Sequence, residues 1–236
     1  MTKTYTLSPS LNPDKVFILQ KSELEKRLDP FFYQEKFTTN ISAIKSGKFP
    51  IKYLREIISG DLIKGSLPKQ EEKEGENSVI QINCINPDGT ISLYDLLKAK
   101  DIFNIQQKLV KGDVLVVITG ATIGKISQWK YDGDYFLGGD IVKFQTNNLA
   151  DNTFIFHVLR WILLQIEMKR NITGATNGHL SPEDIKCLPI PTPPLSKQKE
   201  IADHITAIRQ QAQQLKEKTK ELLAMASLEI ENIILN

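Results

Sequence analysis

The sequence has little of what a metal site or a disulfide framework needs. Its only two cysteines, Cys84 and Cys187, lie far apart and form no Cys-x-x-Cys pair. The three histidines, His157, His179 and His204, are isolated from one another, and none has a second histidine four positions away. Structural zinc sites draw on closely spaced ligands. We therefore expect no metal, no cofactor and two reduced, buried thiols.

Long apolar runs and a strong excess of one charge are also missing. No apolar stretch approaches the ~18 residues that indicate a membrane span, and the polar N-terminus lacks the hydrophobic segment of a signal peptide. We therefore expect a cytoplasmic protein. The formal net charge is only +2, although residues 1–70 carry 12 Lys and Arg against 7 Asp and Glu. This basic third could face phosphates or simply be a solvated surface.

Signatures of catalysis are weak. The stretch 120–125, Gly-Ala-Thr-Ile-Gly-Lys, has three residues between its glycines where a phosphate-binding loop has four, and Ile126 stands where that loop has Ser or Thr. Asp61 together with 71–73, Glu-Glu-Lys, could be assembled into a metal-dependent nuclease site, but the run is hydrophilic and typical of an exposed loop. The sequence favours a protein that binds over one that catalyses, and a nuclease remains an alternative.

The centre of the chain predicts a β-rich domain with flanking helices. Alternating or continuous apolar residues between turn signals indicate short strands, and the β-branched run 113–119 is the best candidate for a buried one. A three-to-four spacing of apolar residues predicts a helix after the strands. The expected strands are 79–85, 113–119, 123–129 and 136–144, and the expected helices are 22–28, 39–46 and 151–170.

A proline-rich segment separates this domain from the rest of the chain. Four prolines fall within 188–195, which disfavours helix and stiffens the backbone in an extended form. The stretch that follows, 196–236, contains no Gly or Pro and predicts one long helix. We therefore divide the chain into a domain at 1–187, a linker at 188–195 and a helix at 196–236, an α+β class ending in a coiled-coil helix.

The predicted helix carries a seam made of two rows. The large row recurs every seven residues, and the small row follows it four positions later in each repeat, which is the spacing of a coiled coil. A single helix cannot bury such a stripe alone, so we expect it to pack on another helix, from its own domain, a second copy or another protein. The large row is Ile201, Ile208, Leu215 and Leu222, and the small row is Ile205, Ala212, Thr219, Ala226 and Ile233.

The loop at 173–179 is a candidate reader of DNA bases. Its side chains are short donors and acceptors, its glycines permit close approach to a groove, and Asn177 can pair bidentately with adenine. Lys169 and Arg170 precede it and could hold phosphate or guanine. The alternative is an ordinary helix end, with Gly174 in the left-handed conformation and Arg170 next to the last carbonyl groups. The residue pattern leaves both interpretations open.

Four segments, in order along the chain, resemble type I restriction–modification specificity subunits. The stretch 111–125, Lys-Gly-Asp followed by an aliphatic run and Thr-Gly-Ala-Thr-Ile-Gly-Lys, resembles the family's Gly-Asp-aliphatic stretch. The Gly-Ala-Thr at 174–176 resembles its short loop. The stretch 188–201 resembles its entry into a spacer helix, and Arg-Leu-Asp-Pro at 27–30 matches its domain start. Together they cover nearly the whole chain.

The resemblance implies a non-catalytic subunit that reads double-stranded DNA and docks methyltransferase and restriction subunits. The family pairs two recognition domains through antiparallel helices, whereas this chain has one domain and one helix, so it resembles a half-subunit that would form a homodimer. A coiled-coil adaptor that binds only protein remains the other alternative. The residues expected to contact DNA are Lys64, Lys69, Thr122, Lys125, Lys169, Arg170, Thr173, Thr176, Asn177 and His179.

Overall fold

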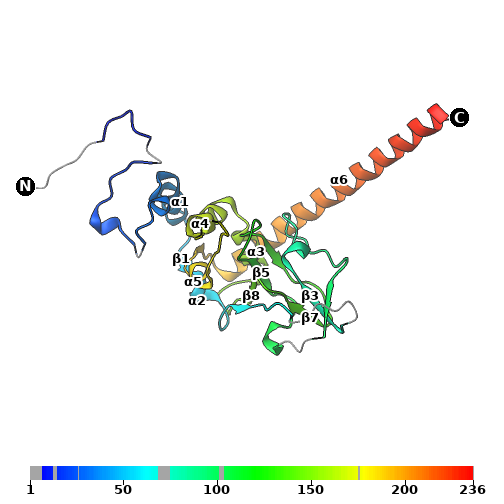
Figure 1. Ribbon diagram of the computed structural model, residues 1–236, viewed down its shortest axis with the longest axis horizontal. Helices are drawn as coiled ribbons and strands as arrows, with labels where there is room; N and C mark the ends of the chain where they lie inside the picture. Colours follow the sequence, from blue (N-terminus) through cyan, green and yellow to red (C-terminus); the bar gives the residue numbers. More distant parts are fainter. Residues whose placement is uncertain are drawn as a thin grey trace, which may run out of the picture.

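The protein consists of an α+β body from which one long helix projects. The computed structural model describes residues 7–12, 15–25, 27–68, 75–100, 104–174 and 176–235. The described N-terminal segment and the end of the long helix, α6, extend from opposite sides of the body (Figure 1). Within the described part of the chain, no helix is long and apolar enough to cross a membrane.

Among the described residues, three small sheets form the β-rich part. The largest has the order β2-β8-β5-β6 and is antiparallel throughout, the second has the order β4-β3-β7 with β3 and β7 parallel, and the third is the pair β1-β9. The strands are β1 (Ile51–Tyr53), β2 (Ile63–Lys64), β3 (Asn77–Ile80), β4 (Leu97–Ala99), β5 (Val114–Val117), β6 (Ile126–Gln128), β7 (Tyr135–Leu137), β8 (Ile141–Phe144) and β9 (Pro189–Pro191).

Strand β5 lies at the centre of the body, as its β-branched sequence predicts. All four of its residues are buried. Because alternate side chains of a strand point to opposite faces, Val114 and Val116 enter a core formed with the helices, while Leu115 and Val117 enter a second core around Trp129. One strand therefore ties both cores together.

The helix expected over 151–170 is two helices. Helix α3 (Asn152–Leu159) begins at Asp151, whose side chain accepts a hydrogen bond from the Phe154 N–H, and α4 (Ile162–Asn171) follows after a break at Arg160 and Trp161. Trp161 is extended, and no glycine or proline marks the break. The prediction of one helix was wrong because both helices bury apolar side chains in the same core, which keeps the spacing continuous.

The proline-rich segment 188–195 is not a free linker. Its residues 189–191 form β9, which pairs antiparallel with β1, and Ile190 is fully buried. The prolines at positions 189 and 191 have no N–H to donate to β1. The neighbouring Leu188 carbonyl nevertheless accepts a hydrogen bond from the Leu54 N–H. The segment is extended, as its prolines predict, and Ile190 packs in the core of the body.

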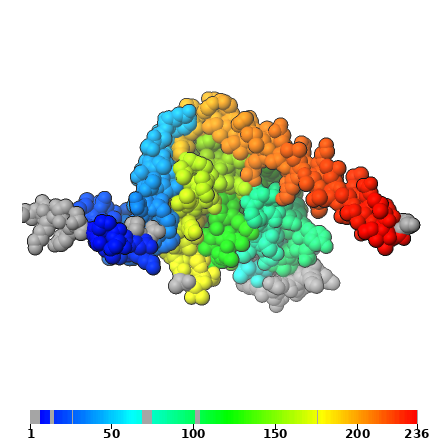
Figure 2. All heavy atoms as spheres, turned by 90° about the horizontal axis from the view of Figure 1, so that it is seen from above, coloured from blue at the N-terminus to red at the C-terminus, as the bar shows by residue number. Residues whose placement is uncertain are grey.

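The long helix is confirmed. Helix α6 spans Leu195–Leu235, 41 residues, or about 60 Å at 1.5 Å per residue. Its first turns pack on α3, where Ala202 and Gln198 are buried. From residue 211 onward every described residue is exposed, and Figure 2 shows this end projecting beyond the body.

Two expected strands and the expected burial of the cysteines differ in part from the structure. The expected strand 79–85 ends at Ile80 and continues into a 3-10 turn, and the expected strand 136–144 is two strands in different sheets. Cys84 is buried as expected, but Cys187 is exposed, so the prediction of two buried thiols was half wrong.

The remaining helical elements are η1 (Lys21–Glu23), η2 (Pro30–Tyr33), α1 (Glu35–Lys45), α2 (Leu54–Ile57), η3 (Ile82–Cys84), η4 (Ile105–Gln107) and α5 (Pro182–Lys186). Thus the described residues of 22–28 have only η1 at their start, and α1 begins earlier than the expected 39–46.

Candidate nucleic-acid interface

The structure brings the two loops singled out in the sequence together at one end of β5. The backbones of Thr173 and His179 exchange hydrogen bonds of 2.9 and 2.7 Å, which closes the 173–179 loop into a narrow hairpin. The Gly120 N–H donates to the Gly178 carbonyl at 3.4 Å, and the Thr119 hydroxyl lies 3.4 Å from His179 Nδ1. Two segments about 50 residues apart in the sequence therefore form one loop cluster.

The turn at 120–125 is a tight connection between two antiparallel strands. The Gly124 N–H donates to Val117 and the Val117 N–H donates to the Lys125 carbonyl, so the turn closes directly onto β5. Gly120 and Gly124 have φ of +81° and +84°, a conformation that favours glycine. A phosphate-binding loop is followed by a helix, whereas β6 follows here, so the nucleotide-binding interpretation is wrong.

The tip of the 173–179 loop presents its side chains to solvent. Thr176 and Asn177 are exposed, and so is Lys169 at the end of α4. Lys169 borders two hollows of about 560 and 520 Å³, one against the 120–125 turn and one against Arg27 and Thr173. Short polar donors and acceptors with a nearby cation are the groups that contact base edges and phosphates.

Arg170 has a different role from the one expected of it. Its side chain is only 4% exposed and forms 3.2 Å ion pairs with Glu167 and Glu25. Its Nε donates to the Phe32 carbonyl at 2.9 Å, and the guanidinium lies 3.6 Å from the Phe32 ring centroid. All of these contacts are internal. The assignment of Arg170 to DNA contact is therefore corrected, and this arginine joins the N-terminal segment to α4.

The other expected contact residues that the structure describes differ in how accessible they are. Lys125 donates its ammonium to the Ile85 carbonyl at 2.9 Å, which holds it against the body. The Thr122 hydroxyl is buried, with no hydrogen-bond partner among the described residues. Lys64 is exposed on β2, two strands from β5 and hence about 10 Å across the sheet. Lys69 lies outside the described residues.

Arg27 is a member of the cluster that residue-by-residue reasoning missed. It lines the hollow beside Lys169 and Thr173, donates to the Asn171 carbonyl and pairs with Asp29 at 3.2 Å. Its place at the start of the 27–30 motif was the available signal, but no local pattern indicates that this segment packs against a loop almost 150 residues later.

The described residues offer little for a nuclease. Asp61, the acid proposed for that reading, forms a 2.6 Å ion pair with Lys186, and this hydrogen bond is the largest cause that lowers its pKa. Residues 71–73 lie outside the described part. Across the part that is described, no group of three His, Cys, Asp or Glu side chains is placed to hold a metal ion.

These features define a class: a loop-bearing binding domain mounted on a long helix. A profile of the type I restriction modification DNA specificity domain matches residues 43–224, well over half of the chain. The chain belongs to this family, whose general function is recognition of a DNA target.

The chain is also similar to known specificity subunits in sequence and in structure. A putative type I restriction enzyme MjaX specificity subunit from Methanocaldococcus jannaschii is 28% identical over 129 residues, which are 54% of this chain and 29% of that protein. The S subunit from M. genitalium aligns with a TM-score of 0.51 at 18% identity, over 73% of this chain and 42% of that one.

The HsdS subunit from Thermoanaerobacter tengcongensis gives a TM-score of 0.54 at 18% identity, over 78% of this chain and 44% of that one. These structural likenesses establish the shared fold. The chain spans less than a third of the curated relative and less than half of these solved subunits.

Proposed function

We propose that the chain is a non-catalytic DNA-specificity subunit that reads one half of a bipartite target and docks methyltransferase and restriction subunits. The observation that carries this proposal is the loop cluster. Two polar, glycine-rich segments meet at one end of the central sheet and leave Thr176 and Asn177 exposed. Loops held by a rigid scaffold are where binding residues concentrate.

In this proposal the members of the cluster have different tasks. Lys169 and Arg27 hold phosphates, which fixes the position of the domain on the duplex without reading sequence. Thr173, Thr176, Asn177 and His179 approach base edges, beside the 120–125 turn. Because each bidentate amide–adenine pair contributes about 1–3 kcal/mol of discrimination, a few such contacts suffice for one half-site.

We further propose that two copies pair through α6. A body with one helix presents one reader, whereas a bipartite target needs two readers at a fixed separation. The exposed stripe on α6 fits a partner helix, with Ile208 at 51%, Leu215 at 66% and Leu222 at 56% exposure. A two-fold pair of chains then matches an interrupted palindrome.

Asn177→Ala is expected to remove sequence information without loss of stability. Selection from a random duplex library should give a half-site motif for the wild type, and the variant should lose about 1–3 kcal/mol of discrimination at one or two positions. Its melting curve should not change, because Asn177 is exposed.

The matched control is Asn148→Ala, an exposed asparagine beyond the opposite end of β5. It should select the wild-type motif. If Asn177→Ala also selects that motif unchanged, the loop assignment is wrong, and if the wild type selects no motif from the library, the adaptor alternative gains support.

A further inference from the structure

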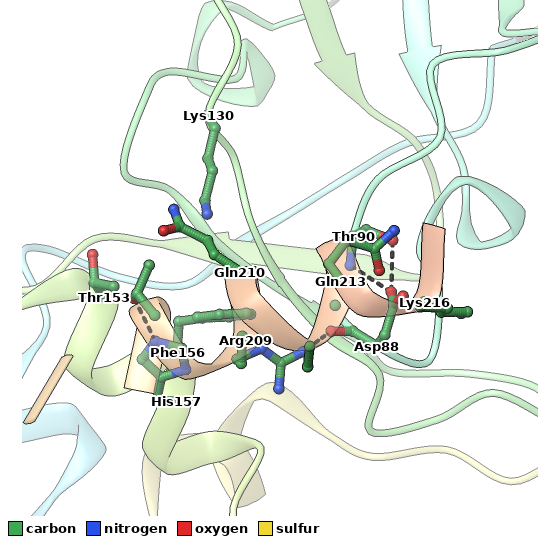
Figure 3. Close-up of a pocket in the computed structure, with 13 residues that line it drawn as sticks. Asp88, Thr90, Lys130, Thr153, Phe156, His157, Arg209, Gln210, Gln213 and Lys216 are labelled. Carbon is green, nitrogen blue, oxygen red and sulfur yellow. Dashed lines mark hydrogen bonds between the residues drawn. The ribbon is translucent and has the colours of Figure 1, made fainter. Parts of the chain in front are cut away.

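A groove rich in positive charge lies where α6 leaves the body. It has a volume of about 430 Å³ and lies between α6 and the 88–90 turn, with Lys130 and Phe156 on its other walls. Figure 3 shows Arg209 directed from α6 toward the Asp88 carbonyl, which accepts its hydrogen bond, and Lys216 further along the same side of the helix. Among the described residues, Asp88 is the one acid on the lining.

The groove carries more positive than negative charge. Burial, followed by the charges of Arg209, Arg160 and Lys130, lowers the pKa of His157 to about 4. Burial and then Arg209 lower the pKa of Arg160 to about 10. The Asp88 carboxylate already accepts hydrogen bonds from Thr90. An anion supplied by a second molecule would therefore stabilise the groove.

The end of α6 supplies such an anion. After Lys220 the sequence has no further Lys or Arg, but it has three glutamates, Glu221, Glu229 and Glu231. Glu229 is the position at which the large row of the seam, Ile208, Leu215 and Leu222, would next recur, so a carboxylate interrupts an apolar row. An acidic side chain at a seam position is costly unless the partner offers it a cation.

The burial of α6 selects one register for an antiparallel pair. Ile201, the first residue of the large row, packs against the core of its own body, so the row open to a partner begins at Ile208. In an antiparallel coiled coil a large-row residue of one helix faces a small-row residue of the other. The register that begins at Ile208 and pairs every exposed seam position sets Ile208 against Ile233 of the second copy. The other facing pairs are then Ala212 with Glu229, Leu215 with Ala226, and Thr219 with Leu222.

This register sets Glu229 of the second copy against Ala212, which lines the groove. Arg209 and Lys216 lie one turn before and one turn after Ala212 on the same side of the helix. The small alanine side chain leaves room for the carboxylate to reach both cations. A register shifted by one heptad toward the body would need Ile201 and would set Lys216 against Lys216 of the second copy, where like charges repel.

We propose that Glu229 of a second copy binds in the cationic groove between Arg209 and Lys216 and so fixes the register and the antiparallel direction of the helix pair. This inference rests on the homodimer of the proposed function. The inference adds a specific intersubunit site. One chain supplies the cations of the groove, and the second copy supplies the carboxylate that completes the site. It also sets the spacing of the two bodies, because the register determines how far apart they are held.

Disulfide trapping tests the register. In a Cys187→Ser background, Ala212→Cys combined with Glu229→Cys should give a covalent dimer on mild oxidation, because the two thiols face each other. Either substitution alone should give none. A covalent dimer from Ala212→Cys alone would show a parallel pair, and linkage by Ile205→Cys with Glu229→Cys, without linkage of the first combination, would show the shifted register. Either result would overturn the inference.

Charge reversal tests the contact itself without a new bond. Glu229→Lys and Lys216→Glu are each expected to raise the dimer dissociation constant by about tenfold or more, and the double variant should return it to within about threefold of the wild type. Both positions are exposed in the single chain, so folding is not at risk.

Light scattering of the wild type separates the two proposals. A wild-type dimer that fails the trapping and reversal tests leaves the homodimer standing and overturns the Glu229 site. A wild-type monomer at concentrations of tens of micromolar overturns both.

Discussion

Leu215→Asp is expected to raise the dissociation constant of the α6-mediated dimer by a factor of about 100 or more. Leu215 is 66% exposed in the single chain and lies in the middle of the seam. Burying a leucine contributes about 1.5–3 kcal/mol. Because a two-fold dimer contains two copies of Leu215, the substitution should weaken association by about 3–6 kcal/mol. Each 1.4 kcal/mol corresponds to about tenfold in affinity.

Multi-angle light scattering across a dilution series measures this effect. The matched control is Gln214→Asp, which adds the same charge at the neighbouring position, off the seam, on an exposed part of the helix. Gln214→Asp should keep the wild-type mass. If Leu215→Asp also keeps it, the seam is not the dimer contact. Circular dichroism should show the same body fold in both variants, because residues beyond 210 do not contribute to its core.

Arg170→Ala is expected to destabilise the body by about 3–5 kcal/mol, the loss typical of removing one partner from a buried ion pair. The change would leave Glu167 buried without its cation and would take away the contacts to Phe32 and Glu25. Urea denaturation measures the loss. Lys169→Ala, the exposed neighbour, should stay within about 0.5 kcal/mol of the wild type and so serves as the control.

The pH dependence of this variant provides a second check. Burial raises the pKa of Glu167, while Arg170 acts to lower it. Without Arg170 the pKa rises further, so the folded state holds its proton to higher pH than the unfolded chain does. The destabilisation should therefore shrink as pH falls toward the ordinary glutamate pKa and grow above it. A deficit that is the same at pH 5 and pH 8 would show that Glu167 is not responsible for it.

Local patterns were sufficient for the elements that depend on local physics. The buried strand at 114–117 follows from a run of β-branched residues, and α6 follows from a long stretch without Gly or Pro that repeats every seven residues. The Asp151 cap and the turn glycines at 120 and 124 were likewise visible as residue types in the sequence.

Features that depend on distant partners could not be predicted in this way. Arg170 looks like a free cation beside a loop, and its burial arises from Glu25 and Phe32, about 140 residues earlier. The prolines of 188–191 look like a linker because their pairing with β1 is a tertiary contact. The cationic groove is invisible for the same reason, since its lining comes from the 88–90 turn, α3 and α6.

The candidate site shows the same division. Its loops were identified from their glycines and short polar side chains, but their meeting at the end of β5 depends on the backbone hydrogen bonds of Gly120 and His179. Which cations border the cluster was only partly predictable. Lys169 remains exposed beside it, whereas Lys125 is held against Ile85 and Arg170 is buried.

In the proposed function, two copies of this chain, joined through α6, read a bipartite DNA target. Methylome sequencing of cells that express the chain with a type I methyltransferase subunit tests this proposal. We predict methylation at a single motif made of two identical half-sites in inverted orientation, separated by a fixed, unspecified spacer. A continuous motif or two unrelated half-sites would contradict the proposal. So would the absence of any methylated motif, provided that the same methyltransferase is active with another specificity subunit.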